Sequence, residues 1–485
     1  MKPSSSVFVL AALALAGMAC ATNPVTGGKE FSLMSEAQEI QLGQQSDPEV
    51  RKEMGVYDDP ALQQYVQDVG MRLARVSQRP DLPWHFAVVD VPAVNAFALP
   101  GGYIYITRGL LAHLDTEAEL AGVLGHEIGH VTARHSARAY TRSASVGIGA
   151  AVTSIFFPAA EPFAAAAQTG LGVLFLKYDR NQEVQSDRLG AEYVAQVGWA
   201  PSGMSDVLAT LGRVSAATDR RGVPNWLSTH PQPEDRVVKV AETVRTLEAA
   251  RAVSEWTVNR DAYRQRLNGL VFGDNPREGI VRGREFIHPD LRFRVRFPDG
   301  WTIENGKQRV TASPPGVDDA VLVLEVVAQP AGSTLEAVAM TAMSKAGCTL
   351  LRGETTRVNG LPAYRGLYEG QAQDRSIARI EAAFIGHARQ VYFLAGMVSR
   401  SKYTQFQAAF DDSLRSFSPI SAEDASRIKP NRIGFMTVRS GDTWQGIAGR
   451  TGGLIHALEL AVLNGYAGNS EPPAGQRIKV VIAGE

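Results

Sequence analysis

Gly125-His126-Glu127-Ile128-Gly129-His130 carries the strongest structural signal in this 485-residue chain, because it contains a complete HExxH pattern. Residues four apart lie on one face of an α-helix, so His126 and His130 can offer two imidazole nitrogens to one Zn²⁺. Glu127 lies beside them, placed to take a proton from a zinc-bound water. The pattern predicts a zinc-binding helix. The alternative is a helix whose two histidines bind no metal.

The residues before this motif favour a helix. Thr116-Glu117-Ala118-Glu119 matches a capping box, in which a threonine side chain caps the first turn and a glutamate reaches back to it. Apolar residues then recur at helical spacing, at Leu120, Val123, Leu124 and Ile128. We therefore expect a helix that begins after Thr116 and carries both histidines.

A catalytic zinc site needs a third protein ligand and an open fourth position. Glu183-Val184-Gln185-Ser186-Asp187 supplies candidates, because it lies in a stretch of helical periodicity from Gln182 to Val197. Glu183 and Asp187 are again four apart. Glu183 is the candidate third ligand, and Asp187 can accept the second ring N–H of a ligand histidine and fix its tautomer. The alternative is a solvated acidic face.

The metzincin class of zinc peptidases is excluded. Its HExxHxxGxxH pattern needs glycine at position 133 and histidine at position 136, where this chain has Ala133 and Ser136. His135, five residues after His130, is interpreted as a structural or surface residue that points away from the metal.

The motifs taken together resemble the M48 family of zinc peptidases, and they occur in the expected order. They are Thr22-Asn23-Pro24-Val25-Thr26-Gly27, the segment from Val94 to Ile106, HEIGH at 126–130, EVQSD at 183–187, and Ser228-Thr229-His230-Pro231 with Arg236. The resemblance covers residues from about 22 to 250, roughly half of the chain. It is strongest to the periplasmic, outer-membrane-associated branch that includes the β-barrel-assembly-enhancing proteases.

The resemblance implies a zinc endopeptidase with one Zn²⁺ per chain. His126, His130 and Glu183 would bind the metal, and Glu127 would act as general base and then as acid to the leaving amine. The implied substrates are misfolded or stalled outer-membrane proteins, with the β-barrel assembly machinery as a further partner. The alternative function is a chaperone or a peptidoglycan-tethered adaptor with little proteolysis.

In the M48 pattern the loop histidine, here His230, lies close to the zinc. It could donate a hydrogen bond to the tetrahedral oxyanion, or occupy the open zinc position and keep the enzyme latent. Arg236 would then anchor the loop or a carboxylate. The alternative is an ordinary surface histidine.

A substrate-binding segment is expected upstream of the zinc helix. Trp84 to Val89 and Gly102 to Thr107 match strands. In zinc peptidases of this general shape an edge strand binds the substrate backbone by strand addition. We assign that role to the strand 102–107 and to the segment before it, with candidate residues Asn95, Ala96, Phe97 and Ala98. The alternative is that Asn95 and Phe97 serve only packing and turns.

The N-terminus matches a targeting segment. Lys2 precedes an apolar run from Val7 to Ala16, which leads to Gly17-Met18-Ala19-Cys20. This resembles a bacterial lipoprotein signal with lipidation at Cys20, although Gly17 stands where leucine is usual, so simple cleavage after Ala19 remains the alternative. The expected location is the periplasm of a Gram-negative bacterium, anchored to the outer membrane. The net charge of −1 gives no indication of nucleic-acid binding.

The predicted fold class is α+β, with a signal peptide of lipoprotein type at residues 1–20. Residues 21–270 would form a mainly helical zincin-type metallopeptidase domain with a small edge sheet. Helices are expected there at Ser35–Gln45 and Ala61–Val76. Residues 143–176, rich in Ala, Gly and Phe, are expected to form a hairpin of two apolar helices, either buried or in contact with a membrane or client.

Residues 285–420 are expected to form a separate α/β sandwich that resembles the PsbP/DcrB-like fold. Strands are predicted at 291–297, 321–327, 379–384 and 390–395, and helices at 333–346 and 401–414. No catalytic cluster is evident in the sequence there, which favours a binding or spacer role. Cys348 is expected to be a buried small hydrophobe.

The C-terminal residues 434–482 resemble a LysM module of βααβ form. The resemblance rests on Val438-Arg439-Ser440-Gly441-Asp442-Thr443-Trp444 and on the later Leu463-Asn464-Gly465. LysM modules generally bind N-acetylglucosamine chains, which in a periplasm implies peptidoglycan. The alternative is a purely structural tail.

Overall fold

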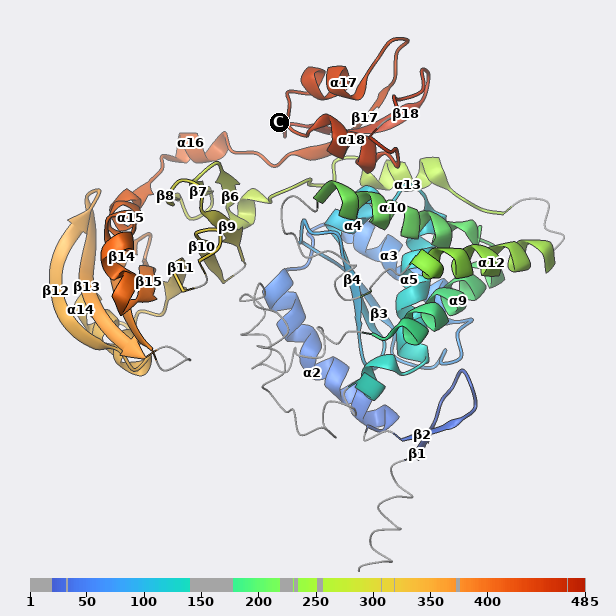
Figure 1. Cartoon of the computed structure of the whole chain (residues 1–485), viewed down its shortest axis with the longest axis horizontal. Helices are drawn as coiled ribbons and strands as arrows, with labels where there is room; N and C mark the ends of the chain where they lie inside the picture. The colour runs from blue at the N-terminus through green and yellow to red at the C-terminus, as the bar shows by residue number, and fades with distance from the viewer. Residues whose placement is uncertain are drawn as a thin grey trace, which may run out of the picture. The chain divides into compact units, whose positions relative to one another are not determined.

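The structure is a computed structural model. It describes residues 20–31, 34–139, 178–218, 230, 234–250, 256–306, 308–317, 319–371, 376–468 and 470–484. These residues divide into two compact units, at Gly273 and Asp274 and again at Pro430 and Asn431. The first unit contains the residues up to Gly273 together with Asn431–Ala483; the second contains Asp274–Pro430. The α+β class is confirmed (Figure 1).

The first unit is mainly helical. Among the described residues before Gly273, its main helices are α2 (Glu36–Met54), α3 (Pro60–Ala74), α4 (Arg108–His113), α5 (Glu117–Thr132), α9 (Arg180–Gln196), α10 (Ser202–Thr218), α12 (Glu234–Ala250) and α13 (Arg260–Leu267). The predicted second helix is confirmed as α3. The first, α2, extends past its predicted end and through Pro48, beyond which Arg51 pairs with Asp47 one turn back at 2.7 Å.

The zinc motif lies on α5, as predicted, and every residue of this helix is buried. Thr116 caps it, with its side chain accepting from the backbone N–H of Glu119 at 3.1 Å. Glu119 does not reach back to Thr116 as a capping box would require. Its carboxylate accepts from the backbone N–H of Asp115 at 2.7 Å instead.

Glycines allow α5 and α9 to approach closely. A Cβ atom at Gly129 would lie 3.0 Å from Cα of Ser186, and one at Gly125 would lie 3.1 Å from Cα of Gly190. A Cβ at Gly190 would lie 2.8 Å from the backbone nitrogen of His126. Any larger residue would push the helices apart. The spacing of small residues therefore brings the acidic motif of α9 against the histidines of α5.

A three-stranded sheet accompanies these helices. Its order is β3 (His85–Val89), β5 (Tyr103–Thr107), β4 (Ala96–Leu99), with β3 parallel and β4 antiparallel to β5. Within the described residues β4 is therefore an edge strand, and β5 is central. The part of the substrate-binding prediction that gave β5 an exposed edge is wrong, because both of its edges are paired.

The C-terminal segment adds β17 (Arg432–Thr437), α17 (Trp444–Arg450), α18 (Ala457–Leu463) and β18 (Arg477–Ile482) to the first unit, in the expected βααβ order. Its core residues belong to the same hydrophobic cluster as those of α3 and α5. Backbone hydrogen bonds of 2.8 Å join Gly269 N–H to the carbonyl of Ile433, and Ile433 N–H to the carbonyl of Leu270. The segment is thus packed into the helical unit.

The second unit is built on a seven-stranded antiparallel sheet with a smaller sheet and two main helices. The large sheet has the order β12 (Thr349–Val358), β13 (Leu361–Gln371), β14 (Ile377–His387), β15 (Gln390–Ser399), β11 (Val321–Val327), β10 (Arg309–Ser313), β9 (Thr302–Asn305). The small sheet has the order β16 (Ser418–Pro419), β8 (Phe293–Arg296), β7 (Glu285–His288), β6 (Ile280–Arg282). A short helix, α16 (Ala422–Ser426), follows β16.

Helices α14 (Leu335–Lys345) and α15 (Tyr403–Ser416) lie on opposite faces of the large sheet. This follows from adjacent residues of β14: Ala383 packs in the cluster of Phe410 on α15, while Phe384 packs in the cluster of Val338 on α14. Cys348 is only half-buried, so the prediction of a buried cysteine is wrong; it lies directly before the edge strand β12.

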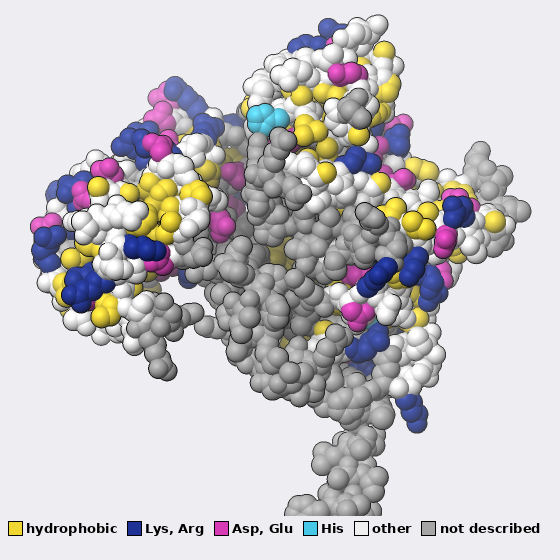
Figure 2. Space-filling view, viewed as in Figure 1, with side chains coloured by type: hydrophobic (Ala, Val, Ile, Leu, Met, Phe, Trp, Pro, Cys, Tyr) yellow, Lys and Arg dark blue, Asp and Glu magenta, His cyan; other side chains and the backbone are white. Residues whose placement is uncertain are grey.

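Two predicted features lie outside the described residues, namely the signal segment before Cys20 and the apolar hairpin at 143–176. Among the helices that the structure describes, none has both the length and the apolar character needed to cross a membrane. On the face shown in Figure 2, basic and acidic side chains are interspersed over the described surface.

Candidate metal centre

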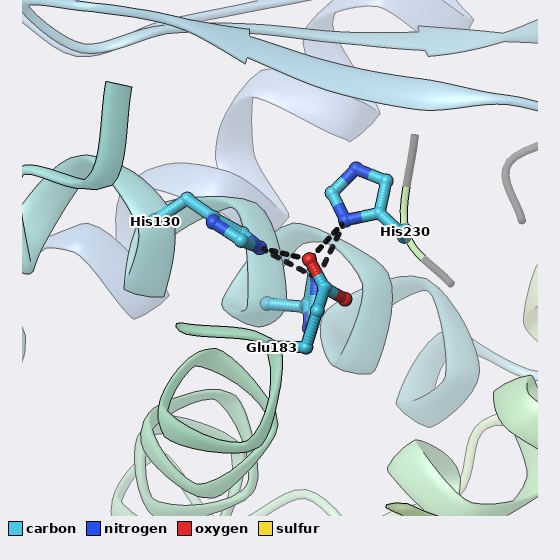
Figure 3. Close-up of side chains that lie close together, drawn as sticks. His130, Glu183 and His230 are labelled. Atoms are coloured by element: carbon cyan, nitrogen blue, oxygen red, sulfur yellow. Dashed lines mark hydrogen bonds and ion pairs between the residues drawn. The ribbon is translucent and has the colours of Figure 1, made fainter. Parts of the chain in front are cut away.

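Four buried side chains converge in the interior of the first unit. His126 and His130 come from α5, Glu183 comes from the first turn of α9, and His230 comes from the chain just before α12. One potential ligand atom from each lies within 4.8 Å of those from the other three. Figure 3 shows His130, Glu183 and His230 pointing toward one another. The sequence motifs thus meet at one point although they are spread over about a hundred residues.

The distances suit a tetrahedral metal site. Nε2 of His126 lies 2.9 Å from Nε2 of His130, and Glu183 oxygens lie 3.6 and 3.3 Å from these two nitrogens. Nδ1 of His230 lies 3.2 Å from Nε2 of His126 and 3.0 Å from Oε1 of Glu183. Nitrogen and oxygen ligands about 2.1 Å from a tetrahedral zinc are roughly 3.4 Å apart. The donor set and its spacing therefore fit Zn²⁺.

Asp187 lies behind this cluster. Its Oδ1 lies 2.8 Å from Nδ1 of His126, the ring nitrogen that faces away from the other donors. Burial alone would raise the pKa of Asp187, but the adjacent guanidinium of Arg236 lowers it below its usual range. Asp187 is therefore a carboxylate that accepts from Nδ1–H of His126, leaving Nε2 of that ring for a metal.

Arg236 bridges the two carboxylates of α9. It donates to Asp187 at 2.5 and 2.8 Å, and its Nη1 lies 2.8 Å from Oε2 of Glu183. The side chain is 0% exposed. Arg236 was predicted to anchor either the loop or a carboxylate, and in the structure it binds the carboxylates of Glu183 and Asp187.

Glu127 lies on the adjoining position of α5 and is fully buried. Its Oε1 is 3.7 Å from Nε2 of His230. Burial opposes protonation of His230, but the carboxylates of Glu183 and Glu127 outweigh it and raise the pKa of this histidine. His230 is 1% exposed, which excludes the surface-histidine alternative.

His135 was expected to be a structural or surface residue pointing away from the metal; the structure excludes the surface position and leaves His135 outside the four-residue cluster. It is fully buried, and its ring meets His130 edge to face with centroids 4.9 Å apart. The helical spacing did not reveal this contact, because the backbone leaves the helix at Ala133 and turns at Arg134, which has φ 56°.

Tyr178 is a second residue that the sequence reasoning missed. Its ring packs against that of His130, tilted by 31° with centroids 3.8 Å apart, and its hydroxyl lies 2.9 Å from Oγ of Ser136. It precedes Asp179, the N-cap of α9. An aromatic residue next to a strong capping box, one turn before a candidate ligand, is the only signal that could have indicated it.

The predicted substrate-binding residues lie at the sheet edge. Ala96, Phe97 and Ala98 belong to β4, and Phe97 stacks on Tyr105 of β5 with centroids 5.0 Å apart. Asn95 precedes the strand, and its backbone is fixed by Thr107, whose hydroxyl donates to the Asn95 carbonyl at 2.9 Å. Its side-chain Oδ1 is buried and has no hydrogen-bond partner among the described residues.

The second unit contains a cavity of about 450 Å³ between β12–β14 and α15. Three of the charged residues that line it pair with one another: Arg365 binds both the buried Glu381, at 3.1 Å, and Asp411. Tyr403 also donates to Glu381 at 3.0 Å. The pairing of these three charges with one another favours a structural role for them, so the chemistry of the chain is assigned to the first unit.

Comparison with known proteins agrees with this assignment. The model of peptidase family M48 matches residues 60–244, and that of the LysM domain matches residues 436–481. The β-barrel assembly-enhancing protease of Escherichia coli (strain K12) is 32% identical over 229 residues, which cover 44% of this chain and 46% of that protein. The mitochondrial metalloendopeptidase OMA1 of Schizosaccharomyces pombe is 31% identical over 242 residues, covering 48% of this chain and 68% of that protein.

The chain thus spans about half the length of the β-barrel assembly-enhancing proteases that it matches. Among solved structures, the cyanobacterial PsbP of Synechocystis sp. PCC 6803 is similar at a TM-score of 0.25 and 14% identity, over 29% of this chain and 95% of that one.

Proposed function

Because the chain belongs to peptidase family M48, whose members are zinc-dependent, we propose that it is a zinc endopeptidase. In this proposal His126, His130 and Glu183 bind one Zn²⁺. The observation that carries it is the convergence of these three side chains and His230 within 4.8 Å, in a buried position. The orientation of His126 by Asp187 at 2.8 Å supports it further, because metal-binding histidines usually donate their second N–H to such a partner.

Glu127 is proposed as the general base and acid. Zinc, when bound, polarises the scissile carbonyl and lowers the pKa of a coordinated water toward ~7. The Glu127 carboxylate takes the proton of the attacking water and then gives it to the nitrogen of the leaving amine. Its full burial keeps bulk water away, so the carboxylate acts in a medium of low dielectric constant. Its place next to both histidines of α5 supports the assignment.

His230 is proposed to hold the enzyme latent by acting as a fourth ligand. Its Nδ1 lies as close to His126 and Glu183 as a fourth tetrahedral donor would. A bound imidazole in that position would occupy the place that catalysis must keep open. The other role, hydrogen bonding to the oxyanion, would require His230 to withdraw from this position, and its Nε2 on the side of Glu127 could then serve as donor.

The substrate is proposed to bind as an extended strand beside β4. The edge position of this strand supports this, because one side of its backbone has no partner strand among the described residues. Asn95, Ala96, Phe97 and Ala98 would then line the peptide.

The proposed clients are misfolded or stalled outer-membrane proteins, because the relatives from Escherichia coli and Vibrio cholerae are named β-barrel assembly-enhancing proteases. The β-barrel assembly machinery is a proposed partner for the same reason.

We further propose a periplasmic location, an outer-membrane anchor through lipidated Cys20, and peptidoglycan binding by the LysM segment. The adaptor alternative is less well supported, since an adaptor would not need a complete metal cluster with a buried glutamate beside it.

The experiment is a comparison of the envelope proteome in the native host between wild type and Glu127→Gln. Glutamine cannot accept the proton, so proteolysis should fall by several orders of magnitude while zinc and fold are kept. Glu242→Gln, an exposed change on α12, is the matched control and should behave as wild type. Cleavage of an unfolded outer-membrane protein at a near-normal rate by purified Glu127→Gln would reject the assigned base.

A further inference from the structure

His130 is contacted on the side away from the proposed metal by a second buried histidine. Nδ1 of His135 lies 3.0 Å from Nδ1 of His130, and the rings are inclined at 76°. The other nitrogen of His130, Nε2, faces Glu183 at 3.3 Å. The contact therefore falls on the nitrogen that does not face the metal position. Whether that nitrogen carries a proton decides whether Nε2 has a lone pair for a metal.

Gln185 determines which of the two histidines donates the hydrogen bond and which accepts it. Its Oε1 lies 3.1 Å from Nε2 of His135, and an amide oxygen can only accept a hydrogen bond. Nε2 of His135 therefore carries a proton. In the neutral ring Nδ1 of His135 is then an acceptor, and it accepts from Nδ1–H of His130. The hydroxyl of Ser186, 3.3 Å from the same acceptor, is compatible because it can rotate. Nε2 of His130 keeps its lone pair.

The opposite arrangement would disable the ligand. If His135 donated from Nδ1, then Nδ1 of His130 would have to accept, and the proton of His130 would lie on Nε2, facing Glu183 and His126. A protonated Nε2 cannot bind a metal. The acceptor at Gln185 is therefore the element that selects the binding tautomer.

The backbone is strained where it places His135. Arg134 has φ 56°, a left-handed conformation that is unfavourable for a non-glycine residue. Two contacts hold it: the guanidinium of Arg134 pairs with the buried Glu39 of α2, and it donates to the carbonyl of Met34 at 2.6 Å. Arg79 also binds Glu39, at 2.9 Å. A turn this costly, anchored on another helix, indicates that the position of the His135 ring matters.

We propose that His135, oriented by Gln185, is a positioning residue that holds His130 in the tautomer able to bind zinc. Helix α9 would then serve both histidines of α5, through Asp187 directly for His126 and through Gln185 and His135 for His130. This inference rests on the proposed zinc site, and its test separates the two.

The test is the zinc affinity of the full chain, measured by competition with a chromophoric chelator. His135→Leu removes the acceptor and should raise the Kd for zinc by about 10–100-fold, the usual loss when such a partner is removed. His135→Gln offers an amide oxygen to Nδ1–H of His130 and should recover most of the affinity. The matched control is His113→Leu, which removes another histidine of the same unit, one that donates to the carbonyl of Gly109 at 2.8 Å. It should leave the Kd unchanged.

A second pair of variants keeps the proposal testable if His135→Leu fails to fold. Gln185 is partly exposed, so its replacement is milder. Gln185→Glu keeps an acceptor for His135 and should bind zinc as wild type does, whereas Gln185→Leu should bind more weakly. Equal zinc affinities for these two variants, or a folded His135→Leu within twofold of wild type, would overturn the inference. A wild-type chain that binds no zinc would instead overturn the proposed function.

Discussion

Lys479 and Leu114 lie 365 residues apart in the chain, yet Nζ of Lys479 donates a 2.8 Å hydrogen bond to the carbonyl of Leu114. A second bond of 2.9 Å joins the same nitrogen to the carbonyl of Ala112. Ala112 lies in the last turn of α4 and Leu114 directly follows that helix, and Lys479 is fully buried on β18. The segment that matches the LysM domain is therefore attached to the chain that leads directly into the zinc-motif helix.

Lys479→Met should lower the free energy of unfolding of the full chain by about 1–3 kcal/mol, because it leaves two buried carbonyls without their donor. Methionine keeps most of the apolar stem, so the change isolates the ammonium. Lys345→Met, an exposed change on α14, is the control. Calorimetric unfolding of both variants is the measurement, and equal effects would contradict a structural role for the ammonium group.

The purified chain should hold one Zn²⁺, and His126→Ala or Glu183→Ala should lose it. Removing either residue leaves the four-donor cluster with three side chains, which no longer complete a tetrahedron, so a chelator should take the metal. Metal analysis after dialysis is the measurement, with the exposed His85→Ala as control. Full zinc occupancy in Glu183→Ala would show that the third ligand lies elsewhere.

His230→Ala should speed the cleavage of an unfolded outer-membrane protein, because it removes the proposed fourth ligand and opens that position. Rates are compared with wild type at equal zinc content. If His230 instead stabilises the oxyanion, kcat should fall by roughly 10²–10³-fold. An unchanged rate would reject both roles.

Gly190→Ala should lower the free energy of unfolding of the first unit by about 1–3 kcal/mol and weaken zinc binding. The added Cβ atom would lie 2.8 Å from the backbone nitrogen of His126 and 3.0 Å from the carbonyl carbon of Gly125. Gly449→Ala on α17 meets nothing within 4 Å and should be neutral or slightly stabilising. Urea unfolding and zinc competition on both variants test this. A Gly190→Ala chain as stable as Gly449→Ala would show that α5 and α9 are not closely packed.

The stability of the first unit should fall as the pH is lowered from about 6.5 toward 4, in part through His113. Burial lowers the pKa of His113 to about 4, despite its hydrogen bond to Gly109. Between these pH values the unfolded chain binds a proton that the folded chain does not, so acid favours unfolding. The share of this partly buried residue is at most about 1.4 kcal/mol per pH unit. His113→Gln should flatten the dependence of the urea midpoint on pH; an unchanged slope would exclude His113 as its source.

The metal-facing residues could be read from local spacing. His126 and His130, and then Glu183 and Asp187, are pairs four residues apart, and a helix places such pairs on one face whatever surrounds it. The periodicity around them is strong enough to predict both helices. The βααβ order of the C-terminal segment was predictable for the same reason, since each element is encoded by its own residues.

Other features depend on contacts between distant parts of the chain. His135 reaches His130 only because the backbone turns at Arg134, which is held by Glu39 of another helix. Arg236 binds Glu183 and Asp187, which lie about fifty residues earlier in the chain. Lys479 joins the C-terminal segment to Leu114, just after α4. Helical and strand periodicity determine which side chains share a face. Which faces meet is decided by close packing, here by the glycines between α5 and α9, and by buried charges that must find partners.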